Sequence, residues 1–483
     1  MHVNKIAQTT LGLNIMTEDQ LERIHHSTLH ILERVGVKVF EPESLSLLST
    51  AGAEVDGNLA RIPPSMVQDA LQSAPKVVSL STRSGESAMI MERGKIYYGT
   101  GSEVPFTIDI NSGERRKVVK EDVCNNARLV DALENVDFLM SLGLVSDVPV
   151  DTSDIHQFEA MRLNSAKPIL FTCYNRQNLE CIIKIAEIAA GGEKALKARP
   201  SLALYAEPTS PLVHSKDALE KLLTCAEKGI PLIYATTPML GATAPVTVAG
   251  ALVVANAEIL SGLVIHQLKS RGAPFIYGGG IPPMHMGTSI CSYGGPERDL
   301  GCISLVRLSQ YYRLPSFTTA GCTDAQVFDQ QAGMEAGFNL VVAGLAGGNL
   351  IHNLGYMGVG MTSCLEHLLL CDEAVGAVKQ LLRGVNVNDE TLALDLIEKV
   401  GPGGHYLAEE HTMLHFKEEL YFPNTLNRKN YDSWKMDGAK TFGEAANDRV
   451  KTILETHTPQ SLPDPEITKI AEIVAERDSH QQV

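Results

Sequence analysis

Short apolar runs recur at intervals through the middle of the chain. Each is rich in Ile, Phe and Tyr and is bounded by Pro, Gly or Thr, which is typical of a buried strand, and each is followed by a longer segment of helical period. The runs lie at 138–145, 167–174, 201–208, 231–238, 274–280, 314–321 and 349–355. Strands that alternate with helices in this way form a parallel sheet.

Seven such strands are one short of a closed barrel, and the eighth could come from 95–99 or from a segment after Arg383. The chain has no GxGxxG motif after the first strand and no Walker loop. The pattern therefore favours an α/β fold of the (β/α)8 TIM-barrel type over a doubly wound sheet. We assign the barrel to residues 126–385.

The residues before the barrel predict an N-terminal α+β cap, 1–125. It opens with an amphipathic helix from Met16 to Val37, with Thr17 and Gln20 in capping-box spacing. Short alternating segments with Gly-containing turn signals follow and predict half-buried strands.

After the barrel, the pattern predicts a helical C-terminal region, 386–456, packed on the barrel, with Asn388 as a helix cap. Residues 457–483 are charged and punctuated by Pro, which predicts either an arm or a disordered tail.

Composition narrows the class of protein. The 483 residues include 44% hydrophobic residues and carry a formal net charge of −16, which disfavours nucleic acid as a partner. Nine cysteines without a CxxC pair indicate a reducing compartment, which we take to be the cytoplasm. The sequence shows no signal peptide, and no run approaches 18 apolar residues, so we expect no membrane span.

Aromatic residues at the predicted strand ends are the strongest candidates for a binding site. Tyr205, Tyr234 and Tyr277 occupy matching positions in LALY, PLIY and PFIY. The carboxyl ends of barrel strands open on the ligand face, so these rings could form a cage for a quaternary ammonium group through cation–π contacts. The alternative is that they fill the top layer of the barrel. Three further aromatic residues at other strand ends could join them: Tyr174, Phe317 and Tyr356.

Two ionisable residues share the predicted rim. Glu207 follows Tyr205 by two residues and could complement a cation, or could form a salt bridge to a neighbouring loop. His352, in NLIHNLG, could hold a substrate carboxylate, although a lone His in an apolar run is more often a core residue.

Two other motifs give weaker indications of a functional site. His405, Glu409, His411 and His415 suggest a metal site, but HTMLH lacks the Glu of an HExxH motif, so we predict no metal. DIHQFEA contains, at Asp154 and His156, the DxH of a corrinoid lower-ligand motif without its following glycine. If a corrinoid takes part, this chain does not carry it.

Four separated blocks, in the same order, resemble the trimethylamine methyltransferase superfamily. They are 241–268, 273–279, 321–333 and 400–416, within a similarity that runs from Met16 to Leu454. The resemblance implies a TIM barrel that passes a methyl group from a methylamine to the Co(I) of a separate corrinoid protein.

The same resemblance bears on the substrate. The founding enzymes carry pyrrolysine in the loop after the seventh strand, and the matching position lies near Met357, in GYMGVGMT. An ordinary residue there argues against trimethylamine. It favours the non-pyrrolysine branch, which resembles enzymes that demethylate glycine betaine, proline betaine and carnitine.

The sequence thus predicts a quaternary-amine:corrinoid-protein methyltransferase that acts on a betaine-type substrate. Methyl transfer from a quaternary ammonium releases a neutral tertiary amine, so the protein need only bind, desolvate and orient the substrate, and no acid–base pair is required. Carnitine or γ-butyrobetaine is the alternative substrate. Other readings are a metal-dependent TIM-barrel hydrolase, which elemental analysis would reveal, and a non-catalytic betaine-binding protein. The Gly/Ala-rich helix and the C-terminal arm make self-association plausible.

Overall fold

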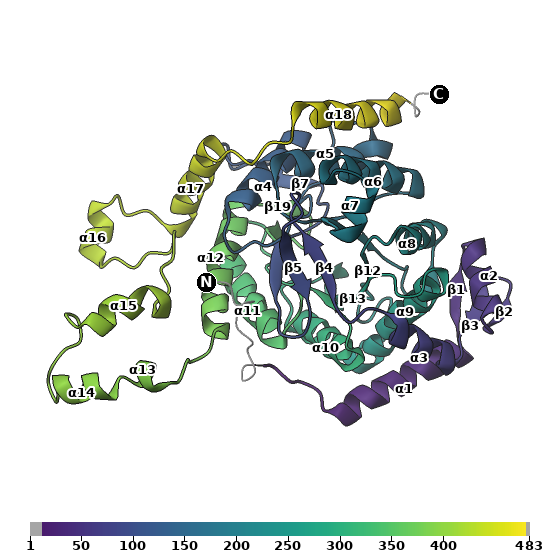
Figure 1. The fold of residues 1–483 in the computed structure, drawn as a ribbon, viewed down its shortest axis with the longest axis horizontal. Coiled ribbons are helices and arrows are strands. Elements are labelled where there is room, and N and C mark those ends of the chain that lie inside the picture. The colour runs from purple at the N-terminus through teal and green to yellow at the C-terminus, as the bar shows by residue number, and fades with distance from the viewer. Residues whose placement is uncertain (1–11, 480–483) are drawn as a thin grey trace.

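A curled sheet of seven parallel strands forms the centre of the protein (Figure 1). The computed structural model describes residues 12–479. Across the sheet, the strands are β6 (Tyr97–Thr100), β17 (Leu350–Leu354), β16 (Ser316–Thr319), β13 (Phe275–Gly279), β12 (Leu232–Thr236), β10 (Leu202–Ala206) and β9 (Ile169–Phe171). Six of the seven predicted runs form strands of this sheet, and the segment at 95–99 supplies β6.

The two edges of the sheet approach each other across a short extended segment. Phe138 makes a single parallel bridge to Gly99 of β6, and Leu139 makes one to Ile169 of β9. In the strand predicted at 138–145, only Phe138 and Leu139 pair with neighbouring strands. Leu142 has a φ of 51°, in the left-handed region, which turns the chain out of the extended conformation.

Side chains on the two faces of the sheet lie in different surroundings, because neighbouring strand residues point to opposite faces. The inner face holds a separate cluster that includes Ile233, Ile276 and Phe317. The hairpin of β4 (Val78–Ser81) and β5 (Ser87–Met91) adds Leu80 and Met89 to this cluster and lies in front of the sheet in Figure 1.

The outer face packs against helices that surround the sheet. These are α5 (Ser153–Asn164), α6 (Arg176–Ala190), α7 (Glu193–Ala198), α8 (Lys216–Lys228), α9 (Val248–Lys269), α10 (Pro296–Tyr312), α11 (Gln330–Ala346) and α12 (Leu365–Leu382). Among the described residues, α9 alone is long and apolar enough to cross a membrane, but 72% of its most apolar window is buried, as in the core helix of a soluble domain.

The N-terminal region packs along α9. It comprises α1 (Glu18–Arg34), β1 (Val37–Val39), α2 (Pro42–Thr50), β2 (Glu54–Asp56), β3 (Leu59–Arg61) and α3 (Pro64–Ser73). The predicted capping box of Thr17 and Gln20 starts α1, which ends at Arg34, short of the predicted Val37. Because β6 belongs to the central sheet, residues 1–125 do not form a structurally separate cap.

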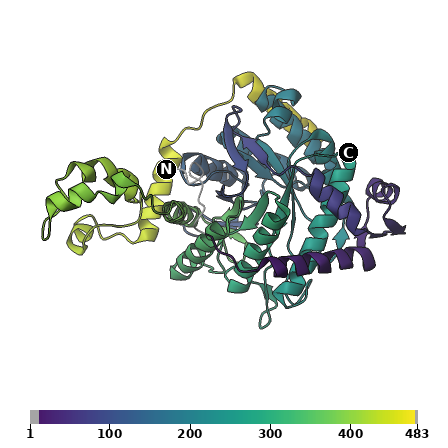
Figure 2. The ribbon, with the colours of Figure 1, turned by 60° about the horizontal axis from the view of Figure 1, so that its bottom comes forward.

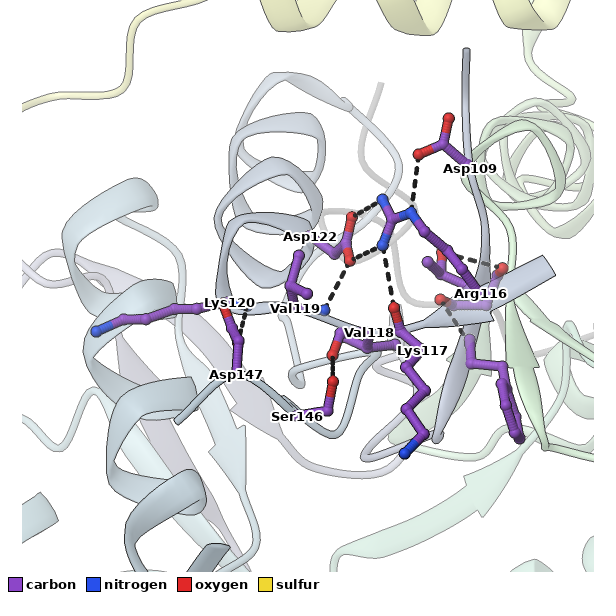
Figure 3. Close-up of polar contacts among 12 residues, drawn as sticks. Asp109, Arg116, Lys117, Val118, Val119, Lys120, Asp122, Ser146 and Asp147 are labelled. Atoms are coloured by element: carbon purple, nitrogen blue, oxygen red, sulfur yellow. Dashed lines mark hydrogen bonds and ion pairs between the residues drawn. The ribbon is translucent and has the colours of Figure 1, made fainter. Parts of the chain in front are cut away.

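A small four-stranded sheet borders the carboxyl ends of the central strands. It consists of β18 (Tyr356–Met357), β19 (Thr362–Ser363), β7 (Phe106–Ile108) and β8 (Arg115–Lys117). Arg116 of β8 contacts Asp109 at 2.9 Å and holds both carboxylate oxygens of Asp122, at 2.6 and 2.8 Å (Figure 3). Asp122 belongs to α4 (Lys120–Ala132), so these contacts join the small sheet to α4.

The C-terminal region differs from its prediction in two ways. The segment with α13 (Asp389–Leu392), α14 (Leu394–Val400), α15 (Glu410–Glu419) and α16 (Tyr431–Met436) projects from the barrel instead of packing on it (Figures 1 and 2). Asn388 does cap α13. The chain returns through α17 (Phe442–Thr456).

Of the two alternatives for the last segment, an arm or a disordered tail, the described part is not disordered: it contains a helix, α18 (Asp464–Ser479), which packs on α5 and α6. It buries Ile470 and Val474, and Asp478 accepts from Thr152. The apolar face of this helix and its contacts stabilise an ordered structure despite the Pro-rich composition of the segment.

Candidate functional site

A cavity of about 290 Å³ lies at the carboxyl ends of the central strands. All seven strands contribute a residue at or just after this end, as the fold class requires of a ligand site. Its lining residues are Ser102, Glu103, Thr172, Tyr205, Glu207, Thr237, Gly279, Gly280, Pro282, Tyr293, Arg298, Phe317, Thr319, His352, Asn353, Tyr356 and Gly360. The volume suits a small molecule, near the lower end of the range for ligand pockets.

Aromatic rings form one part of the wall. The Tyr205 ring lies 5.3 Å from Phe317 and 6.1 Å from His352, and the Phe317 and His352 rings are 4.1 Å apart, centroid to centroid. These three predicted residues therefore gather into one cluster. Such a wall can hold a cationic group against ring faces.

Tyr356 reaches the cavity from β18. Its hydroxyl lies 3.1 Å from the hydroxyl of Ser102. A Cβ at Gly101 would lie 2.1 Å from the Tyr356 ring, so only glycine leaves room for the ring in this position.

Two carboxylates face the same space. Glu207 accepts hydrogen bonds from the hydroxyls of Tyr205 and Thr237, the latter at 3.2 Å, and Glu103 accepts one from Thr172. Glu103 is half-buried, and Glu207 keeps exposed surface. Desolvation raises the pKa of both carboxyl groups, and the negative charge of Glu103 raises the pKa of Glu207 further.

A buried guanidinium lies in the same wall. Arg298, at the start of α10, is 1% exposed. Its Nη1 donates to the Tyr293 carbonyl at 3.0 Å and to Asp299 at 2.9 Å, and its Nη2 donates to Thr319 at 3.0 Å. Burial raises the pKa of Asp299 to about 6.

One atom of this guanidinium, and one atom of another side chain that lines the cavity, have no hydrogen-bond partner among the described residues. They are Nε of Arg298 and the side-chain oxygen of Asn353, both buried. A guanidinium has five N–H donors, and three of those of Arg298 are engaged, which leaves Nε–H and one Nη2–H. A guanidinium can bind a carboxylate through two parallel hydrogen bonds from neighbouring nitrogens.

Tyr234 and Tyr277 do not line the cavity, contrary to the prediction. The Tyr234 hydroxyl lies 2.7 Å from Nδ1 of His214, and the Tyr277 hydroxyl donates to Asn256 at 2.9 Å. Tyr205 pairs in register with Ile233, and Tyr234 pairs with Tyr277. Because neighbouring residues of a strand point to opposite faces, Tyr234 and Tyr277 point to the outer face, which packs against helices.

His352 lines the cavity, and its surroundings favour the neutral form of the imidazole. Its Nδ1 donates to the carbonyl of Thr318 at 2.8 Å, and burial lowers its pKa to about 3. The ring is therefore neutral, and Nε2 presents a lone pair, which repels a carboxylate. Tyr174 lies outside the cavity, with its hydroxyl 3.0 Å from that of Ser153. Met357 is fully buried next to the lining residue Tyr356.

The remaining candidates have structural contacts of their own. The rings of His411 and His415 are 4.4 Å apart, but no group of three His, Cys, Asp or Glu residues with metal-binding geometry occurs within 12–479. Asp154 accepts from the Tyr174 amide at 2.9 Å, and His156 lies 3.0 Å from Asp478. The DxH pair thus holds α6 and α18 in place.

Sequence reasoning missed several lining residues. Glu103 and Arg298 lie outside the strand ends used to find candidates: the first follows β6, and the second begins a helix after a long loop. The recognition of 95–99 as a barrel strand would have pointed to Glu103, because that residue follows it closely. No signal of spacing identifies Arg298.

Fold and site together define an α/β protein with a small-molecule cavity at the carboxyl ends of a curled parallel sheet. A solved structure of the same fold is the monomethylamine methyltransferase of Methanosarcina barkeri, with a TM-score of 0.50 over 99% of this chain and 90% of that one, at 11% identity.

Comparison of the sequence gives the family. Residues 1–481 match the trimethylamine methyltransferase family. A trimethylamine methyltransferase of Desulfitobacterium hafniense is 33% identical over 98% of this chain and 95% of its own length. A glycine betaine methyltransferase of the same species is 32% identical over 96% and 97%. A trimethylamine methyltransferase of Methanosarcina acetivorans is 31% identical over 96% and 95%.

The chain belongs to the trimethylamine methyltransferase family and is a methyltransferase. The predicted superfamily is thereby confirmed.

Proposed function

We propose that this methyltransferase takes a methyl group from a betaine-type quaternary amine, such as glycine betaine or proline betaine, and transfers it to Co(I) of a separate corrinoid protein. The observation that carries the proposal is the pairing, in one cavity, of two carboxylates with a buried guanidinium that retains free donors. A betaine is a zwitterion, and its two charges match these two kinds of group.

The quaternary ammonium would lie against the aromatic rings and the carboxylates. Tyr205 and Phe317 offer ring faces, and Glu103 and Glu207 supply negative charge. A cation–π contact contributes on the order of 0.5–2 kcal/mol per ring. A bound cation also stabilises the ionised form of two carboxyl groups that burial alone disfavours.

The substrate carboxylate would bind Arg298 through Nε and Nη2, with the Asn353 amide beside it. Asn353 can present its amide nitrogen to the ligand if the amide is turned, since the oxygen and nitrogen positions are assigned from contacts. A simple tertiary amine has no group that uses this guanidinium. This supports a betaine over trimethylamine, in accord with the ordinary residue near the family's pyrrolysine position.

The proposed reaction requires the protein only to bind and orient the substrate. Co(I) supplies the nucleophile; the C–N bond breaks in line with its attack, and the electron pair stays on nitrogen, so that the amine leaves neutral. The corrinoid is a second substrate, held by a partner protein. Family membership favours this reaction over the metal-dependent hydrolase.

Carnitine and γ-butyrobetaine remain the alternative substrates. Their charges lie farther apart than those of glycine betaine, and the cavity volume of about 290 Å³ favours the shorter compounds.

Two further features complete the proposal. We infer that the segment at 138–139, which bridges both edge strands, closes the sheet as the eighth member of a TIM barrel. All nine cysteines are free of disulfides, which supports the cytoplasm as the compartment.

A panel of methylated amines with free Co(I) cobalamin tests the proposal. Spectroscopy should show cobalamin methylation with glycine betaine or proline betaine, and none with trimethylamine. Methylation by trimethylamine alone would refute the proposed substrate class, and tight betaine binding without methylation would favour a binding protein.

A further inference from the structure

Glu207 offers one unoccupied carboxylate oxygen to the cavity. Both hydrogen bonds that its side chain accepts, from the hydroxyls of Tyr205 and Thr237, go to Oε1. Within residues 12–479, Oε2 accepts no hydrogen bond and forms no ion pair, although the residue lines the cavity and keeps exposed surface. An ionised carboxylate only accepts hydrogen bonds, so Oε2 can take a donor from a ligand.

The two hydroxyl donors fix the orientation of this carboxylate. Tyr205 belongs to β10, and Thr237 directly follows β12, the neighbouring strand of the central sheet. Hydrogen bonds to an ionised group are stronger than those between neutral groups. The rim of the sheet therefore holds Oε1, and Oε2 is left as the oxygen that is available to a bound molecule.

A betaine cannot use this acceptor. A quaternary nitrogen has four carbon substituents and no N–H, so it interacts with ring faces and carboxylates through its charge alone. When such a substrate enters the cavity, Oε2 loses contact with water and gains no hydrogen bond, which is unfavourable. The ligand that satisfies Oε2 is an ammonium ion with at least one N–H.

The proposed reaction produces such a ligand. When the C–N bond breaks, its electron pair stays on nitrogen, and the released tertiary amine takes up one proton from the solvent, since aliphatic amines are protonated at neutral pH. The resulting ammonium ion keeps the carboxylate and the positive charge of the substrate. It has two methyl groups and one N–H where the substrate has three methyl groups.

We propose that the cavity binds the demethylated product, in its protonated form, more tightly than the quaternary substrate, through an N–H that donates to Oε2 of Glu207. The inference rests on the proposed function, and for glycine betaine the product is N,N-dimethylglycine. Nε2 of His352 is a second acceptor in the same wall, but a neutral imidazole binds a cation less strongly than a carboxylate does. The methyltransferase is thus inhibited by its own product, and a reaction that consumes the tertiary amine is needed to keep it active.

Two opposing effects set the size of this preference. An added hydrogen bond to a charged group strengthens binding about 10- to 150-fold, and the loss of one buried methyl group weakens it about fourfold. The product should therefore bind about 3- to 40-fold more tightly than glycine betaine.

Calorimetry on the full chain, at neutral pH and without a corrinoid, measures the preference directly. N,N-dimethylglycine should have a lower Kd than glycine betaine. In initial-rate assays with Co(I) cobalamin, it should inhibit competitively with glycine betaine, with an inhibition constant below the KM of that substrate.

Two isosteric variants locate the N–H contact. In Glu207→Gln, the hydroxyls of Tyr205 and Thr237 hold the amide oxygen in the place of Oε1, so an NH2 group takes the place of Oε2 and cannot accept a hydrogen bond. The preference for the product should disappear. Glu103→Gln is the matched control, because it removes the same charge from the same cavity. It should weaken the binding of both ligands by a similar factor and keep the preference.

Three results would overturn the proposal. One is a wild type that binds N,N-dimethylglycine no more tightly than glycine betaine. The others are a preference that survives Glu207→Gln, and a preference that is lost in Glu103→Gln. A wild type that does not bind glycine betaine would instead refute the proposed substrate class, whatever its affinity for the tertiary amine.

Discussion

The substitution Arg298→Lys tests the zwitterion site, because it keeps the positive charge and removes the planar fork. In the wild type, Nε and one Nη2 hydrogen are free to bind the substrate carboxylate together, and lysine can supply only one such bond in the same direction. A hydrogen bond to a charged group contributes about 1.5–3 kcal/mol. The variant should therefore lose roughly 10- to 150-fold in kcat/KM for glycine betaine.

The assay compares two substrates in the same variant. Tetramethylammonium carries the quaternary nitrogen but no carboxylate, so its transfer rate to Co(I) cobalamin should change little. Arg298 also bonds to Thr319 and to the Tyr293 carbonyl, and a general loosening of the site would affect both substrates alike. An equal loss for the two would refute the assignment of Arg298 to the carboxylate.

The other predictions concern the cation half of the site and the outer face of the sheet. Tyr205→Ala should weaken betaine binding by about 0.5–2 kcal/mol more than Tyr205→Phe, because the ring face makes the contact; calorimetry that gives equal losses would contradict this. Tyr234→Phe should leave KM unchanged but lower the free energy of unfolding by about 1–3 kcal/mol in urea titrations, since the buried His214 loses its partner; a raised KM with unchanged stability would place Tyr234 in the site after all. Betaine affinity should rise with pH through the raised pKa values of Glu103 and Glu207, because the cation prefers ionised carboxylates, and binding should release protons; titrations in buffers of different ionisation enthalpy that show proton uptake would reverse the sign.

Much of the central sheet could be predicted from the local pattern of apolar residues. Runs such as 231–238 and 274–280 contain their own boundaries, and six of the seven predicted runs are strands. The strand predicted at 138–145 does not form, because Leu142 adopts a left-handed backbone conformation there. The pattern of apolar residues carries no information about the φ angle of a single residue. The helix α18 was not predicted, because the segment is rich in charged residues and Pro and only two of its residues, Ile470 and Val474, are buried.

The site was only partly accessible from sequence. Matching motifs placed Tyr205, Tyr234 and Tyr277 together, but the register of the sheet decides which face each ring takes, and it sends only Tyr205 inward. Arg298 and Glu103 reach the cavity from a helix start and a strand end that are distant in sequence. Such convergence depends on the three-dimensional arrangement of the strands, which no short stretch of sequence contains.

The structure of a complex with glycine betaine tests the central claim most directly. The account predicts the carboxylate against Nε and Nη2 of Arg298, and the trimethylammonium group among Tyr205, Phe317 and the two glutamates. A ligand bound in the opposite orientation, or bound only outside this cavity, would contradict it.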